Sequence, residues 1–341
     1  MCILHLTNKL ENRSPAHIVA KLHVSFISFF CYSRPMLAAS RRVFTSLSSR
    51  VLRRNMSILL SAPEVMQMAK DESNSLVFVD ASWHLDKSRD AEVEYICERI
   101  PDACFLDIDD VAEKASSLPH MLPSKRYFEA CMDTLLRLRR EDTLVIYTTP
   151  GSFSAARAWW MFRVFGHPKV HVLNGGLNAW KAAGGDVEAG PPTHFDFERD
   201  YVAEYNENLV ASREQVVQAM QTGRAQIVDA RSSARFYGEA PEPRPNLASG
   251  HIPGSLNVPA TSLLDPNDVT KYKSREEMRA VLEEAGVVLG ANVICTCGSG
   301  VTAAVIALAL NEVGVKENQV AVYDGSWCEW GSCTELPKAT R

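Results

Sequence analysis

The chain has 341 residues, 46% of them hydrophobic, so it is long enough for two ordinary globular domains. Its formal net charge is −5, but residues 1–55 hold nine Lys or Arg against the single acid Glu11, which leaves the rest of the chain acidic. An acidic body argues against a nucleic-acid groove, because phosphate binding requires clustered cations. No apolar run reaches the length of a membrane-spanning helix, so we expect neither a nucleic-acid nor a membrane partner.

Residues 1–55 differ in composition from the rest, because they are rich in Arg and Ser and nearly free of acids. This composition is typical of a mitochondrial transit peptide, although an ordinary disordered tail would share it. Met56 precedes Ser57 and an apolar run, and could serve as a second start. We therefore expect a mitochondrial protein, with a cytoplasmic form if translation begins at Met56.

From about residue 60 the pattern alternates between strands and helices. A capping sequence from Ser61 to Glu64, with Pro63 at an early position, predicts a short helix. Short apolar runs predict strands at 76–81, 143–147 and 170–173, and helical periodicity predicts helices at 123–138, 155–165 and around Trp180. Strands that alternate with helices indicate an α/β fold with a parallel sheet flanked by helices.

The same order of elements recurs with offsets of 148–152 residues. The strand at 226–230 matches the strand that ends at Asp80, Ile252 matches Ile100, and the segment ending at Trp330 matches the segment ending at Trp180. Between the copies the chain is rich in Gly, Pro and charged residues, which is typical of a linker. We predict two tandem domains, at 60–188 and 209–337, joined by a linker at 189–208.

The second copy contains a candidate nucleophile. The strand that starts at Val293 leads to Cys297, a Gly-rich loop follows, and the apolar run 303–310 predicts a helix. In a parallel sheet such a loop lies at the carboxyl edge, where reactive groups gather. Backbone N–H groups and a helix N-terminus that converge on one sulfur favour the reactive thiolate. The alternative is that Cys297 is a small buried hydrophobe, which is the interpretation we favour for Cys295.

The nine cysteines show no regular disulfide framework, and their odd number favours reduced thiols. A zinc site is conceivable but would lack paired C-x-x-C knuckles; it would comprise Cys295, Cys297, Cys328 and Cys333. We therefore expect neither a metal nor a cofactor.

Four short motifs precede the cysteine loop: DAR at 229–231, RF-x-G at 235–238, PEPR at 241–244 and GHIPG at 250–254. Together with CGSGVT at 297–302 and the duplication, they resemble the tandem-domain rhodanese superfamily, in particular its mercaptopyruvate sulfurtransferase branch. The resemblance covers about residues 60–335 and implies two tandem rhodanese-like domains, of which the second is catalytic.

The resemblance implies that Cys297 becomes a persulfide. Its outer sulfur would be cradled by loop amides, which include those of Gly298, Gly300, Val301 and Thr302. Arg235 and Arg244 would hold the carboxylate of a small anionic substrate, a task for which the planar guanidinium is well suited. Either arginine could instead pair with Glu239 or Glu242 on the surface.

In the first copy the resemblance implies a proton relay. Asp109 and His120 lie in elements similar to the family's F-D-I-D and H-M-L-P motifs, and would relay protons with Ser299 across the domain interface. From the residues alone, His120 could equally be a capped or packed histidine. His251 lies in a turn, and we interpret it as structural.

The chain departs from the family pattern in three places. Residues 147–153 stand where the second copy has its cysteine loop and contain no thiol, so the first domain should be catalytically silent. Arg99 replaces the usual histidine before Ile100, and Asn246 replaces a common glycine. Because of this last change, the family pattern does not predict the path of the loop around Asn246.

The favoured function is transfer of sulfur from 3-mercaptopyruvate to a thiol, with a thioredoxin-like or sulfur-carrier protein as the acceptor. The alternative is a thiosulfate sulfurtransferase that acts as a sulfur relay, for example toward tRNA thiolation. The loop of such enzymes usually carries Arg and Lys, whereas Gly298 and Ser299 are neutral, which favours the monoanionic keto acid. A phosphatase would need an Arg where Ala303 stands, and a purely binding module fits only the first copy.

Overall fold

The structure, a computed structural model, describes residues 57–71, 75–192 and 200–340. The predicted transit peptide at 1–55 therefore lies outside the described residues. Within the described part of the chain, no helix is long and apolar enough to cross a membrane.

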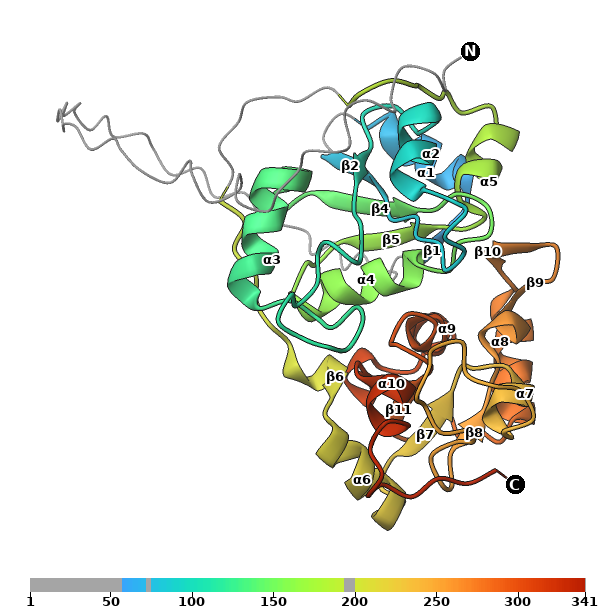
Figure 1. The fold of residues 1–341 in the computed structure, drawn as a ribbon. Coiled ribbons are helices and arrows are strands. Elements are labelled where there is room, and N and C mark those ends of the chain that lie inside the picture. The colour runs from blue at the N-terminus through green and yellow to red at the C-terminus, as the bar shows by residue number, and fades with distance from the viewer. Residues whose placement is uncertain (1–56, 72–74, 193–199, 341) are drawn as a thin grey trace, which may run out of the picture. The chain divides into compact units, whose positions relative to one another are not determined.

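The first half of the described chain forms a five-stranded parallel sheet in the order β1-β5-β4-β2-β3 (Figure 1). The strands are β1 (Leu59–Leu60), β2 (Leu76–Asp80), β3 (Cys104–Phe105), β4 (Thr143–Tyr147) and β5 (Val170–Leu173). The predicted strands at 76–81, 143–147 and 170–173 are thus confirmed. Every residue of β4 is buried, as expected for a central strand covered on both faces.

Five α-helices accompany this sheet: α1 (Ala62–Ala69), α2 (Ala91–Cys97), α3 (Lys125–Cys131), α4 (Ala155–Val164) and α5 (Gly176–Ala182). The prediction for α1 is confirmed in detail, because Ser61 and Glu64 form a capping box and Pro63 lies in the first turn. The prediction of one helix over 123–138 is only partly correct. The α-helix begins after the N-cap Ser124 and changes to a π-helical turn over Met132–Leu136.

The second half forms an equivalent parallel sheet in the order β6-β12-β11-β7-β8. Its strands are β6 (Val210–Ala211), β7 (Gln226–Asp229), β8 (Leu256–Asn257), β11 (Val293–Thr296) and β12 (Val320–Tyr323). The helices are α6 (Arg213–Thr222), α7 (Ser233–Phe236), α8 (Arg275–Glu284), α9 (Ala303–Glu312) and α10 (Ser326–Trp330). A hairpin of β9 (Leu264–Asp265) and β10 (Asp268–Tyr272) is added to this half. Short 3-10 turns lie at Glu207–Leu209, Ala260–Leu263 and Glu317–Gln319.

The two sheets confirm the duplication. The matching strand orders place β1, β5, β4, β2 and β3 in the positions of β6, β12, β11, β7 and β8. The correspondence also extends to an isolated antiparallel bridge in each copy, Arg99 with Glu188 and His251 with Ala339. Arg99 therefore occupies the backbone position of His251, and each precedes a fully buried isoleucine.

The two halves pack together through α4 and α9. Most of the residues of both helices are buried in one shared hydrophobic core. Part of the predicted linker also belongs to this packing, since Tyr201 is buried and its hydroxyl lies 2.8 Å from Nδ1 of His167. Trp160 of α4 donates to the carbonyl oxygen of Leu209 at 3.0 Å.

Candidate active site

The loop that carries Cys297 connects the carboxyl end of β11 to α9. Thr296 is the last residue of the strand, and Thr302 is the N-cap of the helix. Cys297 is 2% exposed. Its N–H donates to the Ser326 hydroxyl oxygen at 3.2 Å, and its carbonyl oxygen accepts the Trp327 N–H at 3.0 Å. These two hydrogen bonds fix the backbone of Cys297 against the start of α10.

The other side of the loop has spare hydrogen-bond donors. The backbone N–H groups of residues 298–302 donate to no acceptor among the residues that the structure describes. Successive N–H groups in a Gly-rich loop before a helix are suited to holding an anion. Gly300 has a φ of +79°, a conformation that glycine adopts readily.

A pocket of about 410 Å³ opens at this loop and is lined by both halves of the described chain. Seven of the ten predicted site residues line it: Cys297, Gly298, Ser299, Val301, Thr302, Arg235 and Arg244. The opposite wall comes from the first half and includes Trp83, His84, Leu85, Asp86, Arg89, Gly151 and Phe153. The structure thus brings a thiol, unpaired N–H groups and two arginines together around one space.

The two arginines differ in their partners. Arg235 pairs with Glu242, whose side chain is only 2% exposed and also accepts Nη1 of Arg231 at 2.7 Å. The pairing that we considered for the surface therefore exists, but its acid is buried. Arg244 forms no ion pair with any described acid, and its Nη2 atom lies 3.4 Å from Nε2 of His120. Of the two, Arg244 has the less compensated charge.

His120 does not line the pocket, but it contacts Arg244, which does. Its Nδ1 atom is 2.6 Å from Oδ1 of Asp109, a close contact whose angle is poor for a hydrogen bond. Trp83 donates its indole N–H to Asp109 at 2.7 Å. Although partial burial acts in the opposite direction, contacts with His120 and Trp83 lower the pKa of Asp109 to about 2. Among the described residues Ser299 forms no hydrogen bond with either member of this pair, so a complete relay is not assembled.

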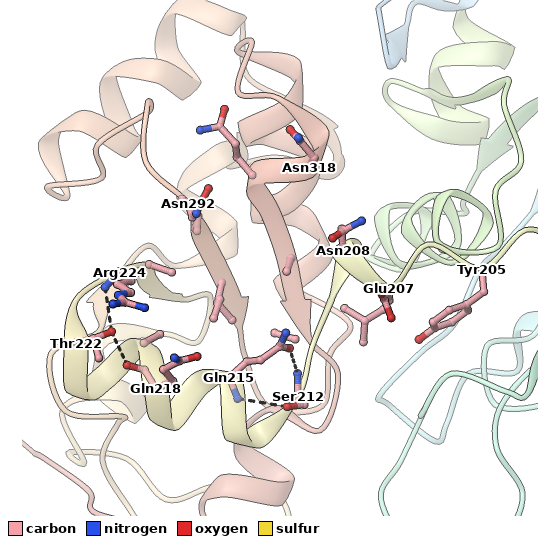
Figure 2. Close-up of a pocket in the computed structure, with 18 residues that line it drawn as sticks. Tyr205, Glu207, Asn208, Ser212, Gln215, Gln218, Thr222, Arg224, Asn292 and Asn318 are labelled. Atoms are coloured by element: carbon pink, nitrogen blue, oxygen red, sulfur yellow. Dashed lines mark hydrogen bonds between the residues drawn. The ribbon is translucent and has the colours of Figure 1, made fainter.

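A larger hollow of about 710 Å³ lies elsewhere on the second half (Figure 2). It is found at the amino ends of β11 and β12, and no cysteine or histidine lines it. Figure 2 shows that Gln215 and Ser212 at the start of α6 bond to each other's backbone. This hollow therefore offers neither a thiol nor an imidazole, in contrast to the pocket at Cys297.

Comparison with known proteins identifies the family. Residues 61–183 and 212–333 each match the family described as rhodanese-like domain. The chain belongs to the rhodanese family. The mitochondrial thiosulfate/3-mercaptopyruvate sulfurtransferase 1 of Arabidopsis thaliana is 38% identical over 282 residues, which cover 77% of this chain and 73% of that protein.

Two further relatives agree with this assignment. The 3-mercaptopyruvate sulfurtransferase of Escherichia coli K12 is 41% identical over 251 residues, which cover 74% of this chain and 86% of that protein. The crystal structure of the Tum1 protein from Saccharomyces cerevisiae is 33% identical, with a TM-score of 0.74, and the match covers 83% of this chain and 98% of that one. The predicted family, α/β fold and enzyme class are confirmed, and the protein is a sulfurtransferase of the rhodanese family.

The first rhodanese-like domain has no thiol in its corresponding loop. Thr148 stands at the position of Cys297, because its carbonyl oxygen accepts the Leu177 N–H at 3.1 Å just as that of Cys297 accepts the Trp327 N–H. Thr149, the next residue, donates its hydroxyl to Glu94 at 3.0 Å. Its N–H donates to Ser82 at 2.8 Å, while Arg89 donates to the carbonyl oxygen of Pro150 at 2.7 Å. These contacts occupy polar groups of the loop, and Gly151 and Phe153 of the same loop line the pocket.

The other cysteines and histidines that we singled out have structural surroundings. Cys295 is fully buried in β11, and burial raises the pKa of its thiol. His251 stacks on Phe236 with ring centroids 3.8 Å apart, in agreement with its structural interpretation. No group of three metal-ligating side chains is found in the described ranges. Asn246 has a φ of +61°, a left-handed conformation that Asn tolerates better than most residues, which accounts for its place in a position that is often glycine.

Sequence reasoning missed several residues that shape the site, namely Arg157, Asp324 and Ser326. Arg157 offered a signal, because it is a charged residue within the apolar run of α4. Asp324 and Ser326 lie in a segment that we used only to recognise the repeat. Their contacts join distant parts of the chain, which no local pattern records.

Proposed function

We propose that the protein transfers sulfur from 3-mercaptopyruvate to a thiol through a persulfide on Cys297. The observation that carries the proposal is the pocket that contains Cys297 and Arg244. Among the described residues, the N–H groups of the Cys297 loop have no acceptor and Arg244 has no acidic partner. A thiolate can attack there, an anion can be held there, and a substrate carboxylate has a cationic partner. The names of the Arabidopsis and Escherichia coli relatives support the choice of donor.

The proposed reaction has two steps. The Cys297 thiolate attacks the substrate sulfur, a sulfur–sulfur bond forms, and the carbon–sulfur bond breaks with its electrons going to the enolate of pyruvate. The enolate takes up a proton, for which Ser299 offers a hydroxyl that lines the pocket, and Cys297 is left as a persulfide. An acceptor thiolate then attacks the outer sulfur, which returns Cys297 to its thiolate form.

Arg244 and Arg235 would orient the substrate carboxylate in the first step. Because Arg235 already balances Glu242, we assign the larger share of carboxylate binding to Arg244. The acceptor would be a thioredoxin-like or sulfur-carrier protein. The first domain, residues 60–188, would close the pocket without taking part in bond making, and residues 209–337 would form the catalytic domain.

Thiosulfate is the second candidate donor, because the Arabidopsis relative is named for both thiosulfate and 3-mercaptopyruvate. We expect it to be the poorer donor here, since Gly298 and Ser299 add no cation for a dianion. We also propose a mitochondrial location, on the basis of the Arg- and Ser-rich tail and the mitochondrial relative, with a cytoplasmic form from Met56.

The test uses protein that starts at Met56, incubated with 3-mercaptopyruvate in the absence of an acceptor. Mass spectrometry should find one added sulfur on Cys297, and the variant Cys297→Ser should carry none, because its hydroxyl is not an anion at neutral pH. Cys328→Ser is the matched control and should still be modified on Cys297. Added sulfur on another cysteine, or faster initial rates with thiosulfate than with 3-mercaptopyruvate, would contradict the proposal.

A further inference from the structure

Arg157 belongs to α4 of the first domain, yet its fully buried guanidinium reaches the catalytic loop. Its Nη1 atom donates to Oδ1 of Asp324 at 2.6 Å and to the carbonyl oxygen of Gly300 at 3.3 Å. Its Nη2 atom donates to the carbonyl oxygen of His120. One side chain thus connects the Cys297 loop, the turn before α10 and the residue that contacts Arg244.

Asp324 completes this cluster from the catalytic domain. Its Oδ2 atom accepts the backbone N–H of Leu122 at 2.7 Å, two residues after His120. The Asp324 side chain is 5% exposed, so its charge and that of Arg157 depend on each other in a poorly solvated site. The same turn contains Ser326, whose hydroxyl accepts the Cys297 N–H.

The contact with Gly300 determines how the loop is oriented. In a planar trans peptide the C=O of one residue and the N–H of the next point in opposite directions. The bond from Arg157 to the Gly300 carbonyl therefore turns the N–H of Val301 away from Arg157, and Val301 lines the pocket at Cys297. The space is closely filled, because a Cβ atom on Gly300 would lie 2.8 Å from Nη1 of Arg157.

The contact with His120 has a similar effect in the first domain. His120 has a φ of +60°, which is unfavourable for a residue with a side chain and must be maintained by its surroundings. Arg157 binds the His120 carbonyl, while the imidazole contacts Asp109 and Arg244. The position of Arg244 is thus linked through His120 to the same guanidinium.

We propose that Arg157 is a positioning residue of the sulfur transfer, which aims the Val301 N–H at the sulfur on Cys297 and holds His120 against Arg244. The proposal rests on the function proposed above. It predicts that the non-catalytic domain controls the rate of chemistry through this one side chain, and not only by closing the pocket.

A matched control is available on the same helix. Arg163 also joins the two domains, because its Nε and Nη2 atoms donate to Glu317 at 2.7 and 2.9 Å. This ion pair is partly exposed and contacts neither the Cys297 loop nor His120. Arg163→Met therefore removes a contact between the domains without touching the cluster of Arg157.

The experiment compares Arg157→Lys, Arg157→Met, Asp324→Asn and Arg163→Met with the wild type, at a temperature at which circular dichroism shows each to be folded. For Arg157→Met we expect kcat with 3-mercaptopyruvate to fall roughly 10- to 100-fold, by more than KM changes, because a small misplacement of reacting groups has effects of this size. Arg157→Lys should lose less, because it keeps the charge beside Asp324 but cannot make all three contacts. Arg163→Met should keep the wild-type kcat.

A second readout does not depend on the donor. The rate at which iodoacetamide alkylates Cys297 at fixed pH, followed by mass spectrometry, should fall in the Arg157 and Asp324 variants and stay unchanged in Arg163→Met. Wild-type alkylation and kcat in folded Arg157→Lys and Asp324→Asn would overturn the inference, and so would an equal loss in Arg163→Met. If Arg157→Met does not fold, the two conservative variants decide. A wild type without turnover of 3-mercaptopyruvate would instead refute the proposed function, and the alkylation rates would still test the inference.

Discussion

The environment of each arginine near the pocket determines what it can contribute. Arg231 is fully buried and is held by Asp229 and Glu242, and its guanidinium lies 4.2 Å from the ring centre of Trp327. Arg235 shares the carboxylate of Glu242, whereas Arg244 has no acid partner among the described residues. The ability to bind a substrate carboxylate therefore increases from Arg231 to Arg244, although all three residues come from one short segment of sequence.

This difference leads to a prediction for the two arginines of the motif. Arg244→Ala should raise the KM for 3-mercaptopyruvate about 10- to 100-fold, since a hydrogen bond to a charged group is worth roughly 1.5 to 3 kcal/mol. Arg235→Ala should raise KM less but lower the melting temperature more, because it leaves the buried Glu242 with one fewer cation. Steady-state kinetics and thermal melts of both variants provide the measurement. Wild-type KM values in both variants would show that neither arginine binds the carboxylate.

Much of the candidate site could be predicted at the scale of single residues. Cys297 and its loop were recognisable because strand, Gly-rich turn and helix are adjacent in sequence, which makes the chemistry a local pattern. The ion pair between Arg235 and Glu242 was also within reach, since seven residues separate them. Arg157 and Asp324 are 167 residues apart, and one sequence contains no information about which distant charges meet.

At the scale of elements, strands were predicted more accurately than the ends of helices. The buried strand β4 is marked by an uninterrupted apolar run, and its bounds agree with the prediction. Helix α3 shows why ends are harder. Its apolar periodicity continues to Leu138, but the chain adopts a π-helical turn and then a left-handed residue at Arg137, with φ 53° and ψ 48°. Hydrophobic spacing alone does not distinguish these conformations.

The left-handed residue at the end of this segment offers a test of stability. Arg137 ends the π-helical turn, and its buried Nη1 atom has no hydrogen-bond partner in the described part of the chain. Because glycine adopts this conformation without a steric cost, Arg137→Gly should raise the free energy of unfolding by about 0.5 to 1 kcal/mol. Arg139→Gly is the control and should lower it, since Arg139 is not left-handed and glycine there gains only chain entropy in the unfolded state. Chemical denaturation of both variants measures the difference, and a loss of stability in Arg137→Gly would contradict the assignment.

At the scale of the whole molecule, the two copies of one fold differ in how they balance the acid at the end of the equivalent strands β2 and β7. Asp229 at the end of β7 is paired with Arg231, whose Nη2 atom lies 2.7 Å from Oδ2. The corresponding Asp80 at the end of β2 has Ser82 in place of the arginine, and receives bonds from its N–H and hydroxyl at 2.9 and 2.5 Å. The same acid is thus balanced by a cation in the second domain, whereas in the first domain it is buried and has no cationic partner among the described residues.

This divergence predicts stability effects of opposite sign. Burial raises the pKa of Asp80 to about 6 from its usual 3.8, so the folded protein holds this proton more tightly than the unfolded chain does. Stability should then fall as pH rises from about 4 to about 6 and remain lower above that range. Asp80→Asn removes the buried charge and should make the protein more stable at pH 8, by on the order of 2 to 3 kcal/mol, with little change near pH 3.

Asp229→Asn provides the matched comparison in the other copy. It leaves Arg231 with Glu242 as its remaining acidic partner among the described residues. Removing one charge of a buried ion pair destabilises a protein by roughly 3 to 5 kcal/mol. Denaturant unfolding of both variants at pH 3 to 8 measures the two effects. If the transition is not two-state, the unfolding of each rhodanese-like domain is followed separately. The expected result is a stabilised Asp80→Asn and a destabilised Asp229→Asn at pH 8. Destabilisation by both changes would contradict the interpretation of Asp80 as a buried acid whose charge is not balanced by a cation.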